Sequence, residues 1–72
     1  MKVEQTKGGE HMRNYVADRI DDASSEQLEE RFEAGDDVAA IAEAKAIVTR
    51  NQWDAAEVWD RDADQYVGEV RK

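Results

Sequence analysis

Three aspartates at alternate positions near the C-terminus have the residue type and spacing that could bind calcium. Asp60, Asp62 and Asp64 match the D-x-D-x-D start of a calcium-binding loop, in which carboxylate oxygens supply ligands. The match then fails, because Gln65 stands where the sharp-turn glycine belongs and Arg71 replaces the bidentate glutamate that closes the cage. We therefore expect a solvated hairpin turn with Asp64 in a left-handed conformation, and calcium binding is the minor alternative.

Other chemistry finds even less support in the sequence. His11 is the only histidine and there is no cysteine, so neither a zinc site nor a Ser-His or Cys-His relay can be assembled. Pairs of carboxylates are expected by chance in so acidic a chain. We expect Trp53 and Trp59 to pack in the core or in a hairpin rather than against a ligand. The sequence predicts no enzyme, no cofactor and no metal.

The charge balance is the strongest global signal. The 72 residues contain 18 Asp and Glu against 10 Lys and Arg, which gives a net charge of −8. Direct binding to nucleic acid is disfavoured, because such proteins neutralise phosphates with clustered Lys and Arg. Basic partners are favoured instead, although the same bias would suit a salt-rich cytoplasm. The apolar runs are short, so we expect a cytoplasmic protein with no membrane segment.

Residues 1–11 are set apart from the fold as a flexible N-terminal extension. Residues 8–12, GGEHM, can be encoded by a purine-rich ribosome-binding sequence followed by a start codon, which would make Met12 the native first residue. An ordinary flexible arm is the other interpretation. In both cases residues 12–72 are expected to form a single domain.

One helix is predicted at residues 37–51. Gly35 ends the preceding element, Asp36 is a suitable N-cap, and Asp37 favours the positive end of the helix dipole. The helix has one apolar stripe and one polar side. The stripe contains Ala40, Ile41, Ala44, Ile47 and Val48, and Ala39, Glu43 and Arg50 lie opposite.

A hairpin is predicted beyond the helix, from two short runs rich in valine and aromatic residues at 55–60 and 65–70. Strand alternation places Val58 with Ala56 on one face and Trp59 with Glu57 on the other. It also places Tyr66, Gly68 and Val70 together, opposite Val67 and Glu69. We expect Trp59 to pack across the hairpin against Tyr66 or Val67, and Gly68 to make room for a neighbouring ring.

The region before the helix is ambiguous. Residues 15–20 resemble a strand, whereas residues 27–34 fit both a strand and a helix with Ser24 or Ser25 as its N-cap. We favour a strand, because one helix and one hairpin cannot close a core and two more strands would give a sheet for the helix to cover. Residues 21–26 would then form the connecting loop.

The segments FEAGDDVAAIAEAKAIV and AAEVWDRDADQYVGEV together resemble small ββαββ proteins of phages and mobile elements, including anti-CRISPR inhibitors. The resemblance covers residues 15–71 and rests on layout and hydrophobic spacing. It implies an α+β fold, in which a small antiparallel sheet of three or four strands is covered on one face by a single amphipathic helix. It also implies a small inhibitor that acts without cofactors by occluding a partner's surface.

These observations lead to two functional hypotheses. The first is a small acidic, non-enzymatic binding protein that occludes a basic nucleic-acid-binding surface of a host complex. Its acidic side chains would replace phosphates as partners of Arg and Lys. The second is a small salt-adapted housekeeping protein that acts as a structural module or homodimer through an open sheet edge or face. The predicted partner-binding residues are Asp36, Asp37, Glu43, Asp54, Asp60, Asp62 and Asp64.

Overall fold

The computed structural model describes residues 12–20 and 27–72, which form a four-stranded antiparallel sheet and one helix. The strands lie in the order β3-β2-β4-β5, and every neighbouring pair is antiparallel. This confirms the predicted ββαββ layout and shows that residues 29–34 form a strand. The predicted extension 1–11 and loop 21–26 lie outside the described residues. The elements are β2 (Arg13–Ile20), β3 (Glu29–Ala34), α1 (Asp37–Asn51), β4 (Ala55–Asp60) and β5 (Gln65–Arg71).

Helix α1 begins and ends at the predicted residues. The N-cap Asp36 accepts a hydrogen bond from the backbone N–H of Ala39 at 2.8 Å, which satisfies one of the free donors of the first turn. The helix ends at Asn51, and the C-cap residue Gln52 adopts a left-handed conformation with φ of 60°. Its backbone N–H then reaches the carbonyl oxygens of Thr49 and Val48. Both ends of the helix are therefore capped locally.

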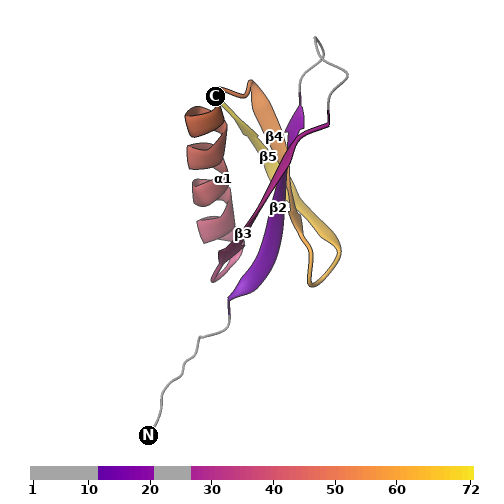
Figure 1. The fold of residues 1–72 in the computed structure, drawn as a ribbon. Coiled ribbons are helices and arrows are strands. Elements are labelled where there is room, and N and C mark those ends of the chain that lie inside the picture. The colour runs from indigo at the N-terminus through magenta and orange to yellow at the C-terminus, as the bar shows by residue number, and fades with distance from the viewer. Residues whose placement is uncertain (1–11, 21–26) are drawn as a thin grey trace, which may run out of the picture.

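Helix α1 covers one face of the sheet and contacts all four strands (Figure 1). Its buried residues are Ala40, Ala44, Ile47 and Val48, so the predicted stripe is confirmed, with Ile41 partly buried at its margin. The alanines let the helix approach the strands closely. The core side chains from the sheet include Tyr15, Ala17, Ala56, Val58 and Val70.

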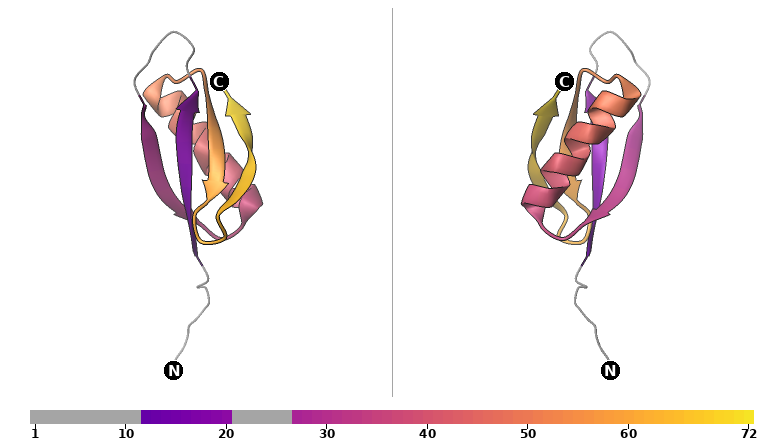
Figure 2. Two further views of the ribbon diagram at one scale, coloured as in Figure 1. Left: turned by 90° about the vertical axis from the view of Figure 1, so that its right-hand side faces the viewer. Right: turned by 90° about the vertical axis from the view of Figure 1, so that its left-hand side faces the viewer.

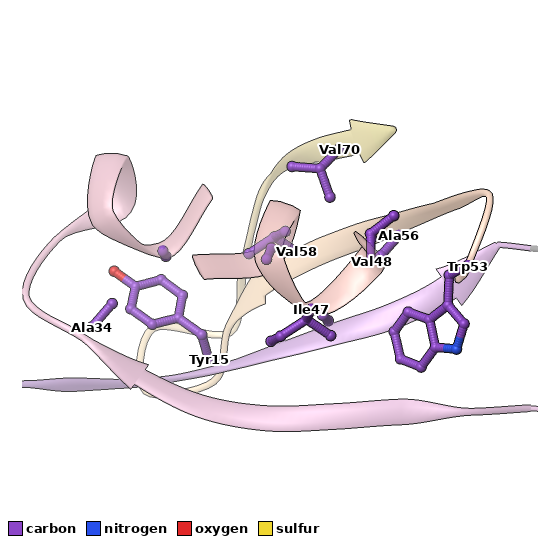
Figure 3. Close-up of a cluster of buried hydrophobic side chains, with 11 residues drawn as sticks. Tyr15, Ala34, Ile47, Val48, Trp53, Ala56, Val58 and Val70 are labelled. Atoms are coloured by element: carbon purple, nitrogen blue, oxygen red, sulfur yellow. The ribbon is translucent and has the colours of Figure 1, made fainter. Parts of the chain in front are cut away.

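Tyr15 fixes β2 to the start of the helix (Figure 3). Its side chain is fully buried, its ring stacks on Phe32 with centroids 5.7 Å apart, and its hydroxyl donates to Asp37 Oδ1 at 2.9 Å. Burial first, and then the hydrogen bond and charge of Asp37, raise the pKa of Tyr15 to about 12. Trp53 closes the other end of the cluster.

The hairpin forms as predicted, but two details of β5 were wrong. The register shifts between Val58 and Trp59, so Gly68 pairs with Val58 while Tyr66 pairs with Trp59. Such a bulge adds one residue to β5 and moves Tyr66 to the face opposite Gly68. The missing side chain of Gly68 also makes room for Ile41, whose Cδ1 would lie 3.3 Å from an added Cβ, rather than for a ring.

Within residues 12–20 and 27–72, no helix has the length and apolar character needed to cross a membrane.

Candidate protein-binding surface

The second face of the sheet is not covered by any described element (Figure 2, left). Successive residues of a strand point to opposite faces, so this open face carries the residues that alternate with the core positions. Val16 belongs to this open face, because it is only 9% exposed and yet lies outside the core cluster under the helix. A partner could approach this open face without disturbing the helix.

Four carboxylates cross the open face in one row, which we call the acidic row. Asp18 of β2 is the register partner of both Glu29 in β3 and Glu57 in β4. Glu57 in turn is paired with Glu69 in β5, so every strand contributes one acid. Neighbouring strands lie about 4.8 Å apart, so the row extends over about 14 Å. Like charges placed directly opposite each other destabilise a sheet.

The electrostatics of Asp18 reflect this crowding. Its pKa is raised, first because partial burial disfavours the charged form and then because of the charges of Glu29 and Glu57. The two ends of the row are partly neutralised by ion pairs within their own strands. Arg31 Nε lies 3.2 Å from Glu29 Oε2, and Arg71 pairs with Glu69.

A second row of the open face, the apolar row, lies beside the acidic row. It contains Val16, its partner Trp59, and Tyr66 opposite Trp59. The rings of Trp59 and Tyr66 meet edge to face with centroids 5.4 Å apart, as the sequence predicted. Tyr66 remains 51% exposed, although it is a large aromatic side chain. Carboxylates and an aromatic pair, of which Tyr66 is exposed and Trp59 partly exposed, therefore share one surface.

The seven predicted partner-binding residues are not on this face as a group. Five of them come to the end of the molecule where α1 starts and the β4–β5 turn lies (Figures 1 and 2). These five are Asp36, Asp37, Asp60, Asp62 and Asp64. Asp54 lies at the opposite end, between α1 and β4, and Glu43 is exposed on the helix. Their assignment as partner contacts stays a prediction.

Two aspartates of the turn have local hydrogen-bond partners. Asp60 is only 2% exposed, and its carboxylate accepts from the backbone N–H groups of Asp62 and Ala63 at 3.0 Å. Arg13 also forms an ion pair with Asp60, with Nη1 3.0 Å from Oδ2. Asp62 accepts from the backbone N–H of Asn14 at 2.9 Å and from its side chain at 3.2 Å, which lowers the pKa of Asp62. These carboxylates organise the turn.

The remaining predicted residues are divided between local roles and exposed positions. Asp36 caps the helix and Asp37 accepts from Tyr15. Asp64 has φ of 56°, which confirms the left-handed conformation predicted for it. Within residues 12–20 and 27–72, no group of three or more His, Cys, Asp or Glu side chains is arranged to hold a metal ion.

The acidic row was missed by the sequence analysis for a physical reason. Its members are spread over 52 positions of the chain, from Asp18 to Glu69, and only strand register brings them together. The available signal was the alternation of Glu57 with Ala56 and Val58, which places this acid opposite the core face. Alternation gives the face of each acid, but it does not give the partner across the strand.

Comparisons with known proteins add no further information about this surface. The chain matches no known protein family, no curated protein and no solved structure.

Proposed function

We propose that this chain is a small acidic, non-enzymatic binding protein that covers a basic, nucleic-acid-binding surface of a partner complex. This is the mode of action implied by its resemblance to phage and mobile-element inhibitors. The observation that supports the proposal is the acidic row on an open sheet face. A basic partner would neutralise the four carboxylates of the row, whereas in the isolated chain these carboxylates repel one another.

The positions of the charges support a basic partner. Asp18 and Glu57 stand directly opposite each other, and neither carboxylate has a hydrogen bond or ion pair within the described residues. A sheet needed only as a scaffold would place opposite charges or apolar residues at such a pair. Features that oppose local stability are expected mainly where function requires them. Complementary charge also speeds association with a basic surface and makes binding sensitive to salt.

The alternative, a salt-adapted homodimeric module, is favoured by a different observation. The apolar row, and the outer edges of β3 and β5, which pair with no other described strand, could contact a second copy. Face-to-face contact between two copies, however, would bring two acidic rows together. The charge of this face therefore favours a basic partner over a second copy.

The proposal is tested by capture from lysate with the full-length tagged chain. One bait carries Asp18→Asn with Glu57→Gln. The comparison bait carries Glu43→Gln with Asp54→Asn, two of the partner contacts predicted from the sequence, and so removes the same charge away from the open face. Partners are identified by mass spectrometry after elution with rising salt. Each captured complex is then tested for loss of labelled nucleic acid when the chain is added.

We expect the wild-type bait to recover a nucleic-acid-binding complex at low salt, the open-face variant to lose it, and the comparison variant to lose much less of it. Addition of the chain should release the nucleic acid. Equal recovery by the two double variants would contradict the role of the acidic row. Recovery of the chain alone, at every salt concentration, would contradict the proposed function and favour the homodimer.

A further inference from the structure

The four acids of the acidic row are not equivalent. The outer acids, Glu29 and Glu69, already pair with Arg31 and Arg71, each two residues away on the same strand and therefore on the same face. The inner acids, Asp18 and Glu57, have no cationic partner within the described residues. Among the residues that the structure describes, the row thus has cationic partners at both ends and none at its centre.

The inner pair has the spacing of a site for one cation. Directly opposed residues of antiparallel strands place their Cβ atoms about 4.5–5.5 Å apart, so the carboxylates of Asp18 and Glu57 can share one positive group. A guanidinium has five N–H donors in a planar fork and can donate to both carboxylates at once. An ammonium group is a compact, strongly hydrated point charge with no flat surface.

The apolar row places an aromatic surface beside this pair. Trp59 follows Glu57 by two residues and Val16 precedes Asp18 by two, so both lie one row away on the same face. Trp59 is partly exposed and contacts the exposed Tyr66 through its ring. Arginine binds well where its guanidinium can both stack on an aromatic ring and donate to carboxylates.

We infer that the centre of the open face binds an arginine side chain of a basic partner protein, with the guanidinium between Asp18 and Glu57 and against Trp59. This inference rests on the proposed function, and it specifies arginine as the side chain of the partner that the acidic row binds. Charge complementarity supports a basic protein as the occupant. The acidic row repels nucleic acid, and in a second copy Arg31 and Arg71 are already paired.

The test compares two synthetic peptides of equal length and charge, oligoarginine and oligolysine, titrated into the full-length chain in dilute buffer. Binding is followed by NMR through the indole N–H signals of the two tryptophans and the backbone amides. We expect oligoarginine to bind about three- to tenfold more tightly. The signals of Trp59, Asp18 and Glu57 should shift, while that of Trp53, buried in the core, should not.

Variants separate an arginine site from general attraction between opposite charges. Trp59→Leu should abolish the preference for oligoarginine but leave salt-sensitive binding of both peptides, and Trp59→Phe should retain most of the preference. Asp18→Asn with Glu57→Gln should weaken binding more than Glu43→Gln with Asp54→Asn. The dispersion of the NMR spectrum shows for each variant that the fold is intact.

Three outcomes would overturn the inference: equal affinities for the two peptides, a preference that survives Trp59→Leu, or shifts confined to residues 60–64. Binding of both peptides with equal affinity would still leave a charge-driven binding protein. The capture experiment decides on the proposed function separately, because it requires a nucleic-acid-binding partner and places no condition on arginine.

Discussion

At the scale of single residues, similar carboxylates have opposite effects on the folded state. Asp60 is buried, but its carboxylate accepts two backbone hydrogen bonds and forms an ion pair with Arg13, so its charge is compensated. Asp18 is less buried, yet its register neighbours are Glu29 and Glu57. The stability of this fold therefore depends on where each acid is placed as well as on the total charge.

The first prediction is that Asp18→Asn stabilises the protein. Removal of the charge relieves the unfavourable burial, and then the repulsion from Glu29 and Glu57, which together raise the pKa of Asp18. We expect the free energy of unfolding at neutral pH to rise by about 0.2–1 kcal/mol, measured by urea denaturation. Glu43→Gln on the exposed helix surface removes the same charge and should change stability less.

The pH dependence gives this prediction a definite sign. Because the pKa of Asp18 is raised in the folded state, the folded protein takes up this proton at a higher pH than the unfolded chain does. As the pH falls from the raised pKa to the ordinary value of 3.8, the destabilisation caused by the charge of Asp18 is therefore lost. The advantage of the asparagine variant should therefore be full at neutral pH and vanish near pH 3.8. A difference that stays constant over this range would show that Asp18 carries no charge penalty in the fold.

At the scale of elements, what could be predicted from sequence depended on how local the determining contacts are. Helix α1 follows from the Asp36 cap and an apolar stripe within 15 residues, and its bounds were predicted correctly. The β5 face of Tyr66 was predicted wrongly, because a bulge depends on how two strands fit together rather than on alternation within one. The contact that Gly68 makes room for likewise depends on another element, since Ile41 approaches it from α1.

The candidate site was harder to predict than the fold for the same reason. The aspartates of the turn stand together in the sequence, and they were chosen because that density is visible. In the structure, Asp60 and Asp62 accept hydrogen bonds within the hairpin and from Asn14, while their role as partner contacts stays a prediction. The acidic row is formed by register between strands that are distant in the chain, which no local pattern reveals.

The second prediction concerns the β4–β5 turn. Asp60→Ala leaves the N–H groups of Asp62 and Ala63 and the guanidinium of Arg13 without their acceptor. We expect a loss of about 1–3 kcal/mol in the free energy of unfolding. Asp60→Asn keeps a side-chain oxygen for the two amides, so it should lose less. Urea denaturation measures both variants.

Asp64→Asn is a suitable control for the turn, because asparagine tolerates the left-handed conformation seen at this position. It removes a charge from the same turn but no described hydrogen bond, so stability should hardly change. If Asp60→Asn were as damaging as Asp60→Ala, the ion pair with Arg13, rather than the bonds to the amides, would hold the turn.

At the scale of the whole molecule, the net charge of −8 acts on folding and on binding in opposite directions. Repulsion among the acids opposes the compact state, so screening by salt stabilises the fold. The same screening weakens attraction to a basic partner. A binding protein of this kind should therefore be less stable and bind more tightly in dilute buffer.

The third prediction is that the free energy of unfolding rises with sodium chloride in two stages. The Debye length falls from about 30 Å at 0.01 M to about 10 Å at 0.1 M, which screens the general charge, and reaches about 3 Å only near 1 M. Neighbours in the acidic row lie about 4.8 Å apart, so their mutual repulsion should persist until the second stage. Asp18→Asn with Glu57→Gln should reduce mainly the rise in the free energy of unfolding near 1 M. Glu43→Gln with Asp54→Asn should reduce mainly the rise between about 0.01 and 0.1 M. A chain that is unfolded in dilute buffer and folds only near molar salt would instead favour the salt-adapted alternative, because a partner that binds by charge could not then be bound by a folded sheet face.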